Sequence, residues 1–156
     1  MLSDILSPET CAKCRNCCIF EKQSAWELPT FSVGAAARLA DHPDYPMREE
    51  NGRYRITLPY DETGAAQPCP FLDPDSGCTL SASEKPFACS IWPVRVMRDT
   101  DGLLRLALYR GCPGIPAESH DALDKLLENG LRERIMEETK TDHSLILPYH
   151  PNYQFL

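Results

Sequence analysis

The chain lacks the marks of a secreted or membrane-spanning protein. No stretch of its 156 residues reaches the roughly 18 apolar residues that a membrane-spanning helix needs. The first residues carry neither the basic region nor the apolar segment of a signal peptide. We therefore expect a cytoplasmic protein with no membrane partner. In that compartment thiols stay reduced and structural disulfides are rare.

Basic residues are also in short supply. Lys and Arg number 16 against 23 Asp and Glu, for a net charge of −7. A phosphate-binding surface needs a concentration of Lys and Arg, and no basic stripe with interleaved aromatics is present. We expect no nucleic-acid partner. The sequence shows no repeat and an ordinary 42% of hydrophobic residues, which predicts a single domain over residues 1–156.

Proline is frequent and favours short elements. The chain has 14 prolines, and six of them share residues 59–93 with three cysteines. Such a segment buries little apolar surface and needs something to pin it. We predict an α+β fold: a small antiparallel sheet, two or three helices, and long Pro-rich loops pinned by metal centres.

A few segments carry clear secondary-structure patterns. A helix is expected over residues 30–41, capped by Thr30 or Ser32 and ended by Pro43 and Pro46. Alternation after a turn at Asn51-Gly52 predicts a strand over 53–58, and Asp101-Gly102 predicts a hairpin of 94–98 with 103–109. Leucines at helical spacing predict a scaffold helix over 119–139 with Ser119 as its cap. The apolar tail at 145–149 should dock on the core.

Cysteine is the residue present in excess. The eight cysteines are Cys11, Cys14, Cys17, Cys18, Cys69, Cys78, Cys89 and Cys112. They are too many for a cytosolic protein, partly clustered, and placed in segments with little core. Thiolate coordination explains all three facts, because metal binding supplies folding free energy where hydrophobic burial cannot. Disulfides and buried thiols without metal are the alternatives.

The spacing of the first cysteines points to a cluster. Cys11, Cys14 and Cys17 repeat a C-x-x-C step, the local spacing by which bacterial ferredoxins bind a [4Fe–4S] cluster. Ferredoxins add a cysteine followed by proline, and Cys69 and Cys112 each precede a proline. Structural zinc sites usually take two C-x-x-C knuckles, and this chain has one such segment. A [4Fe–4S] cluster is therefore the preferred cofactor, with zinc as the alternative.

The neighbouring pair Cys17 and Cys18 suggests two centres. Adjacent side chains point in different directions on a helix or a strand, so the two thiols should serve different centres or bridge two metals. Eight cysteines divide into two fours. The expected sets are Cys11, Cys14, Cys17 and Cys112 for one centre, and Cys18, Cys69, Cys78 and Cys89 for the other.

With these residues in view, the sequence resembles the CxxCxxCC family, small bacterial proteins described as zinc- or iron-chelating domains. The resemblance covers roughly residues 11–112. Its matching segments are Cys11-Ala12-Lys13-Cys14-Arg15-Asn16-Cys17-Cys18, Cys69-Pro70-Phe71-Leu72, Gly77-Cys78 and Lys85-Pro86-Phe87-Ala88-Cys89-Ser90-Ile91-Trp92-Pro93. The family typically shows Arg-Pro-x-x-Cys-Arg where this chain has Lys85-Pro86 and Ser90, which leaves the cysteine set intact.

The resemblance implies a metal-binding module used for structure, electron transfer or metal handling. A domain of this type also occurs within flagellin lysine methylases, which implies as an alternative a metal-dependent enzyme or an accessory factor in protein modification. A third possibility is a partner-binding protein whose metal holds only a docking surface. This chain shows no glycine-rich loop for S-adenosylmethionine and no nucleophile elbow. Four cysteines for each of two centres suggest closed sites, which favours the non-enzyme interpretation.

The remaining candidate ligands are less informative. The histidines stand apart from one another at His42, His120, His143 and His150. We expect surface or capping roles for them, with His150 the one to check as a ligand. Trp26 and Trp92 are expected in the core or over a cluster, and Trp92 follows Cys89 by three residues.

Overall fold

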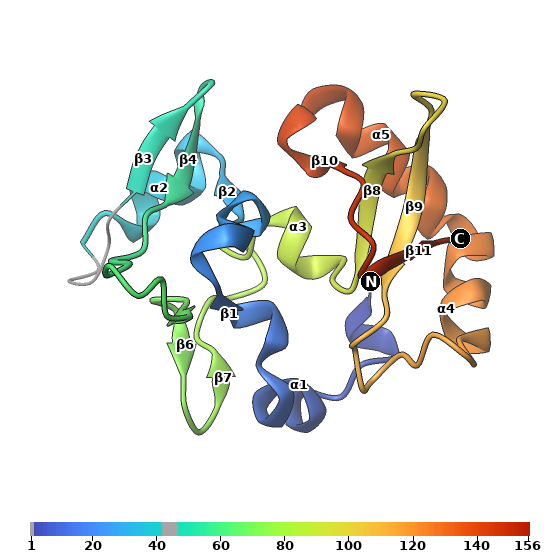
Figure 1. The fold of residues 1–156 in the computed structure, drawn as a ribbon, viewed down its shortest axis with the longest axis horizontal. Coiled ribbons are helices and arrows are strands. Elements are labelled where there is room, and N and C mark those ends of the chain that lie inside the picture. The colour runs from blue at the N-terminus through green and yellow to red at the C-terminus, as the bar shows by residue number, and fades with distance from the viewer. Residues whose placement is uncertain (1, 42–46) are drawn as a thin grey trace. The chain divides into compact units, whose positions relative to one another are not determined.

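The computed structural model of the chain describes residues 2–41 and 47–156 (Figure 1). It divides into two compact units. Unit 1 comprises Met1–Cys11 and Ser90–Leu156, and unit 2 comprises Ala12–Cys89. The boundaries fall within helix α1 (Pro8–Cys14) and helix α3 (Phe87–Ser90). The α+β class is confirmed, while the single domain remains a prediction.

Unit 1 is built on a four-stranded sheet. The expected hairpin is confirmed as β8 (Val94–Arg98) and β9 (Leu104–Tyr109). Strand β11 (Tyr153–Phe155) pairs antiparallel with β9, and β10 (Ile146–Pro148) pairs parallel with β8, giving the order β10-β8-β9-β11 (Figure 1). The sheet is therefore mixed where the sequence predicted an antiparallel one. The apolar tail accounts for the difference, because it docks as a parallel edge strand.

The turn of this hairpin is fixed by Asp99. Its Oδ1 accepts hydrogen bonds from the backbone N–H groups of Asp101 and Leu103, both at 2.9 Å. Gly102 completes the turn at φ 81°, a conformation that favours glycine. These local bonds explain why the Asp-Gly signal located the hairpin correctly.

The expected scaffold helix is present in three pieces. Helix α4 (Asp121–Leu126) runs into a π-helical turn over Leu127–Leu131, and α5 (Arg132–Thr141) follows. Gly130, at φ 98°, sits in the interruption. The first cap position is His120, so the expected cap at Ser119 is wrong by one residue. Across the described part of the chain, no helix has both the length and the apolarity to cross a bilayer.

The core of unit 1 lies between its sheet and these helices, where α5 packs on β8. Its most deeply buried side chains are Leu2, Ile91, Val94, Val96, Met97, Leu106, Leu108, Leu123, Ile135 and Tyr153. The ring of Trp92 lies 5.1 Å from that of Tyr109 and 6.3 Å from that of Tyr153, with the Arg95 guanidinium 4.4 Å from its centre. Trp92 thus packs as a core aromatic of unit 1.

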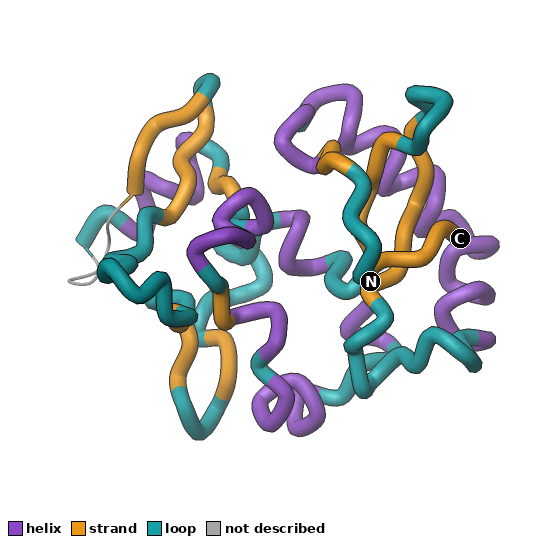
Figure 2. Tube along the Cα trace, in the orientation of Figure 1, coloured by secondary structure: helices purple, strands orange, loops and turns teal. Residues whose placement is uncertain are grey.

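The described residues of unit 2 form three small sheets with short strands (Figure 2). The largest has the order β2 (Thr30–Phe31), β4 (Arg53–Ile56), β3 (Met47–Glu50), all antiparallel. The expected strand over 53–58 is β4, and Asn51 and Gly52 form its turn with positive φ. The two others are the pairs β1 (Ile19–Phe20) with β5 (Gln67–Pro68), and β6 (Leu72–Asp73) with β7 (Gly77–Cys78).

Helix α2 (Val33–Leu39) is shorter than the expected helix over 30–41, because Thr30 and Phe31 belong to β2 instead. Ser32 is the cap, and its side chain accepts a hydrogen bond from the Ala35 N–H at 3.2 Å. The expected stops Pro43 and Pro46, and also His42, lie outside the described residues. Short 3-10 turns occupy Leu2–Asp4, Asn16–Cys18, Lys22–Glu27 and His143–Leu145.

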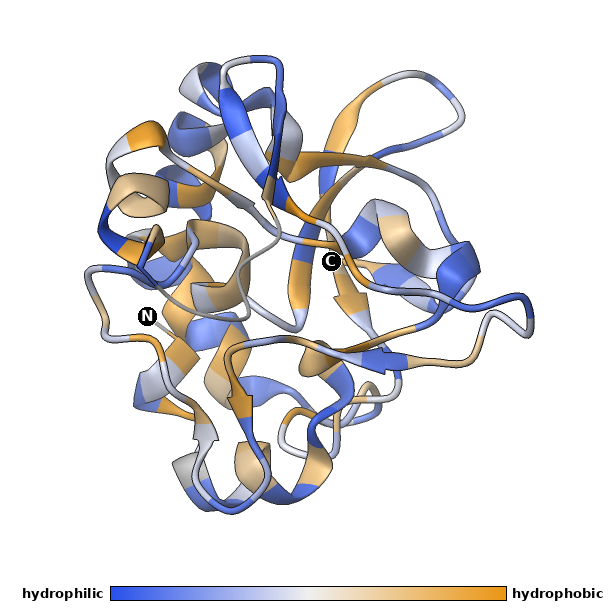
Figure 3. Cartoon of the chain, turned by 90° about the vertical axis from the view of Figure 1, so that its left-hand side faces the viewer, coloured by the Kyte–Doolittle hydropathy of each residue, from blue (hydrophilic) through white to orange (hydrophobic). Residues whose placement is uncertain are grey.

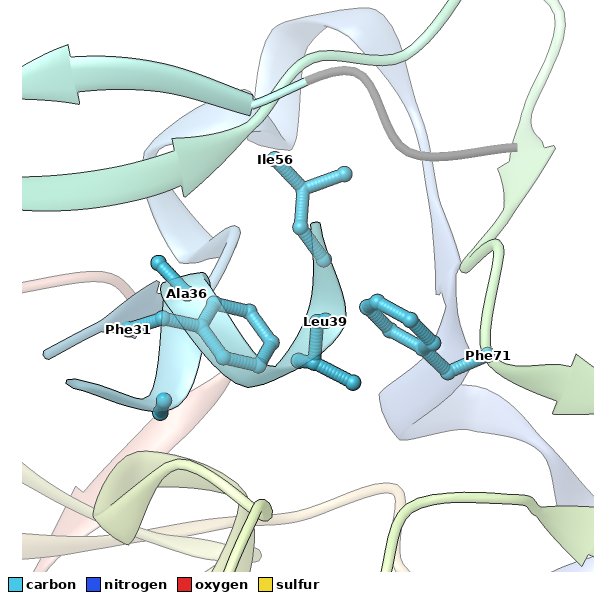
Figure 4. Packing of buried hydrophobic residues seen from close by; sticks show 6 residues of the cluster. Phe31, Ala36, Leu39, Ile56 and Phe71 are labelled. Atoms are coloured by element: carbon cyan, nitrogen blue, oxygen red, sulfur yellow. The ribbon is translucent and has the colours of Figure 1, made fainter. Parts of the chain in front are cut away.

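A compact apolar cluster holds unit 2 together (Figure 4). Its buried members are Phe31, Ala35, Ala36, Leu39, Ile56 and Phe71. The rings of Phe31 and Phe71 lie 5.8 Å apart, and Cys69 packs against the cluster from its edge. Apolar and hydrophilic residues alternate over short distances along the ribbon (Figure 3), as expected of a chain with small cores and many loops.

Candidate metal centre

The CxxCxxCC segment forms a helix followed by a tight turn. Helix α1 ends at Cys14, and a 3-10 turn over Asn16–Cys18 follows at once. Between them Arg15 adopts the left-handed conformation, with φ 58° and ψ 0°. A left-handed residue after a helix reverses the chain direction. Cys17 and Cys18 are therefore presented from a turn that is separate from the helix carrying Cys14.

Backbone pairing places Cys18 beside Cys69. Strands β1 and β5 pair antiparallel with Ile19 opposite Pro68. The ladder continues into the cysteines, because the Cys69 N–H donates to the Cys18 carbonyl at 2.7 Å. Two cysteines separated by 51 positions in the sequence are thus neighbours across one short ladder.

A hairpin adds Cys78 to this pair. In the β6–β7 hairpin Leu72 lies opposite Cys78, and the Leu72 N–H donates to the Cys69 carbonyl at 2.9 Å. The tip is fixed by Asp73, whose Oδ1 accepts from the N–H groups of Asp75 at 3.0 Å and Ser76 at 2.7 Å. The β6–β7 hairpin therefore reverses the chain after Cys69 and places Cys78 opposite the strand that follows Cys69.

The sulfurs of Cys17 and Cys18 lie 3.7 Å apart. This differs from the expectation that adjacent cysteines point in different directions. The reason is local: Cys18 is the last residue of the 3-10 turn, and the chain becomes extended at Ile19, with φ −128° and ψ 122°. The change of backbone conformation at Cys18 removes the regular rotation between neighbouring side chains that a uniform helix or strand would impose.

Several cysteines act electrostatically on Cys18. The pKa of its thiol is raised, first by the hydrogen bond with Cys17, then by burial, and then by the like charges of Cys17, Cys69 and Cys89. Like charges act strongly only over short distances in a partly buried setting. Cys89, on α3, therefore belongs to the same group.

Cys69 has a similar environment with one added feature. Burial raises the pKa of its thiol to about 11, and the charges of Cys78 and Cys17 contribute in the same direction. The backbone N–H of Phe71 donates to the Cys69 sulfur and opposes the rise. An amide that donates to sulfur favours the thiolate, which is the form that binds metal.

Charge interactions link five cysteines of unit 2, since Cys18 interacts with Cys17, Cys69 and Cys89, and Cys69 interacts with Cys17 and Cys78. We call them the thiol group. Cys14 belongs to the same unit, whereas Cys11 and Cys112 belong to unit 1. Cys11 and Cys78 are exposed, Cys112 is buried, and the others are partly buried. In the described ranges, 2–41 and 47–156, no three Cys, His, Asp or Glu side chains converge closely enough to hold a single metal ion.

The chemistry of the thiol group fits a cationic centre. The strongest charge interactions on Cys18 come from other cysteines, and each disfavours its thiolate. A metal ion or a cluster reverses that balance, because it is the largest positive charge in such a site and deprotonates the coordinating thiols. The residues that would hold it are Cys18, Cys69, Cys78 and Cys89, with Cys17 alongside.

The three described histidines, His120, His143 and His150, belong to unit 1. Nδ1 of His120 lies 3.0 Å from Oδ2 of Asp124, at the start of α4. Nδ1 of His150 accepts from the Asn152 N–H at 3.2 Å and so caps a turn, and His143 is exposed. These positions agree with the expected surface and capping roles.

Sequence reasoning missed two contributors, Arg15 and the Phe71 N–H. Both act through backbone geometry. The chain between the end of α1 at Cys14 and the next turn at Asn16 passes through a left-handed residue. This conformation is usually taken by glycine, so an arginine at position 15 does not predict it. The Phe71 amide follows Pro70, and its bond to sulfur depends on the turn after Cys69.

Comparison of the chain with protein-family models, with curated proteins and with solved structures gives no match.

Proposed function

We propose that this protein is a cysteine-thiolate metal-binding domain whose principal centre lies in unit 2 and is held by Cys18, Cys69, Cys78 and Cys89. The observation that carries the proposal is the backbone pairing of the cysteine segments: the Cys69 N–H donates to the Cys18 carbonyl at 2.7 Å, and Cys78 lies opposite Leu72 in the β6–β7 hairpin. The charges of Cys69 and Cys89 on Cys18, and of Cys78 on Cys69, agree with this grouping. Four neighbouring thiols from four segments of the chain repel one another as thiolates, which costs folding free energy unless a cation is present. A bound centre turns that cost into folding free energy.

A [4Fe–4S] cluster is the preferred occupant. In such a cluster each thiolate ligates the cluster rather than one shared ion, so the four sulfurs need to surround it and need not meet at one point. The C-x-x-C steps of Cys11, Cys14 and Cys17, a spacing shared with bacterial ferredoxins, support this choice. The centre then serves structure, electron transfer or metal handling.

One observation favours zinc as the second candidate. The sulfurs of Cys17 and Cys18 are 3.7 Å apart. Two thiolates on one tetrahedral zinc are separated by about 3.8 Å, as follows from a Zn–S bond of about 2.3 Å. Under this alternative Cys17 and Cys18 share one ion, and the site is structural.

Cysteine variants test the proposal. The full chain, prepared without oxygen and reconstituted with iron and sulfide, is assayed for iron, sulfide and zinc as the wild type, C18S, C69S and C11S. The proposal expects C18S and C69S to lose the same centre. C11S is the comparison variant, because Cys11 belongs to unit 1 whereas the four proposed ligands belong to unit 2, and its loss should spare that centre.

The stoichiometry also tests the expected second set of Cys11, Cys14, Cys17 and Cys112. With two centres, C18S and C11S each remove about half of the metal, and the losses add in the double variant. Loss of all metal in C18S alone indicates one centre. A wild-type chain that takes up neither iron nor zinc contradicts the proposal.

A further inference from the structure

Arg15 stands at the turn between the two halves of the CxxCxxCC segment. It is one of two non-glycine residues with positive φ in the described part of the chain, the other being Asn51 in a hairpin turn. Asparagine adopts this conformation readily, whereas an arginine does not. An unfavourable backbone conformation persists only where other contacts stabilise it, so Arg15 should make such contacts.

The guanidinium of Arg15 makes two such contacts within unit 2. Its Nε donates to the carbonyl of Ala12 at 2.8 Å, which satisfies one of the last carbonyls of α1. Its Nη2 donates to the carbonyl of Pro74, at the tip of the β6–β7 hairpin. One side chain therefore joins the end of the cysteine helix to the hairpin that carries Cys78.

Close packing supports the same connection. A Cβ placed on Gly77, next to Cys78, would lie 3.4 Å from the Ala12 Cβ. That distance is ordinary van der Waals contact, so α1 and β7 lie against each other, while the positive φ of Gly77, 87°, is what favours glycine there. The Arg15 bonds and the Gly77 contact thus join the same two segments, α1 near Ala12 and the β6–β7 hairpin.

We infer that Arg15 is a positioning residue for the metal centre: its guanidinium clamps the cysteine turn to the β6–β7 hairpin and sets the spacing of Cys17 and Cys18 from Cys78. The inference rests on the proposed function. It assigns Arg15 no bond to the metal. The guanidinium binds two carbonyls in different segments at once through its planar set of N–H donors. Metal binding should therefore depend on this donor geometry of Arg15, and not on its charge or its left-handed backbone.

Three variants separate these contributions. R15A removes the fork and leaves a strained backbone. R15G removes the fork but adopts the left-handed conformation without strain. R15K keeps the charge without the two-pronged donor. The matched control is R98A, because Arg98 in unit 1 also donates from its guanidinium to a backbone carbonyl, that of Gly102, at 2.7 Å.

The probes are zinc and cobalt(II), titrated into the reduced, metal-free full chain. Zinc affinity is measured by competition with a chromophoric chelator, and the cobalt spectrum reports how many thiolates bind. Loss of a residue that orients metal ligands typically weakens binding by about 10- to 100-fold. We expect that loss in R15A and R15G, with fewer thiolates on cobalt, a smaller loss in R15K, and wild-type affinity in R98A. Chemical unfolding of each metal-free variant measures stability separately.

The outcomes are distinct. R15G with wild-type affinity overturns the inference, because residue 15 would then serve only through its backbone. Affinity losses in R98A that match those of R15A at equal destabilisation also overturn it, because the effect would be general. A wild-type chain that binds neither zinc nor cobalt contradicts the proposed function itself. Binding by the wild type with no loss in any Arg15 variant contradicts the role of Arg15 alone.

Discussion

The metal-free protein should become less stable as the pH rises from 8 to 10, and Cys69 should be a main cause. Burial raises the pKa of its thiol from an ordinary 9.0 to about 11 in the folded chain. The folded state therefore holds this proton more tightly than the unfolded state does. A group of this kind contributes its full stability below the unfolded pKa, and the contribution is lost as the pH rises toward the folded pKa.

The size of the loss follows from the two pKa values. At pH 8 the thiol is protonated in both states, and nothing is lost. At pH 10 it is mostly ionised in the unfolded chain and mostly protonated in the folded chain. The difference costs the folded state about 1.3 kcal/mol, given about 1.4 kcal/mol per pKa unit.

Urea unfolding of the reduced, metal-free chain measures this loss, with C69S as the reference. Other groups also titrate in this range, so the informative quantity is the wild-type change between pH 8 and 10 minus the C69S change. We expect about 1.3 kcal/mol for that difference, and its disappearance when metal is bound, because a bound cation holds the thiolate in the folded state. Equal pH dependence in wild type and C69S would refute the burial of Cys69 on which the site is built.

Three further predictions concern the elements that carry the site, and each is checked by chemical unfolding of the metal-free chain. Phe71→Ala removes a ring that is 2% exposed and should lower the free energy of unfolding by about 3–5 kcal/mol. The control Phe155→Ala removes a ring that is 37% exposed and stacked on one neighbouring ring, and it should cost about 1 kcal/mol. Equal costs would contradict the burial of Phe71 in the core of unit 2. Gly77→Ala and Gly102→Ala should each cost roughly 1–2 kcal/mol, because both glycines have positive φ and a Cβ at neither position comes closer to another atom than ordinary van der Waals contact. A neutral Gly77→Ala would contradict the left-handed conformation at the start of β7. Ser32→Ala should cost about 1 kcal/mol and Ser32→Gly only a few tenths, and a neutral Ser32→Ala would contradict the cap of α2.

The parts of the fold that the sequence predicted are those set by neighbouring residues. The β8–β9 hairpin follows from a turn that Asp99 and Gly102 fix locally. Strand β4 follows from alternation after a turn at Asn51-Gly52. In contrast, the parallel pairing of β10 with β8 joins segments about 50 positions apart, and no local pattern encodes it. The π-helical turn before α5 was visible only as a glycine within a helical pattern.

The candidate site was predictable in its residues and not in its arrangement. The cysteines were visible as an excess that needed a common explanation. Their grouping depends on the β1–β5 ladder, which places Cys69 beside Cys18, and on the change of backbone at Cys18, which brings its sulfur to Cys17. Strands of two residues carry too little pattern to be recognised. The role of Arg15 depends on a backbone conformation that its residue type does not favour.

The most direct test of the central claim, that these cysteines hold a metal centre, is the metal content of the full chain purified without oxygen. Its absorption spectrum is recorded, and iron, sulfide and zinc are counted per chain. We predict a brown protein that absorbs broadly in the visible, with about four iron and four sulfide per centre. A colourless protein with stoichiometric zinc would contradict the preferred cofactor, and a chain with stable disulfides and no metal would contradict the claim itself.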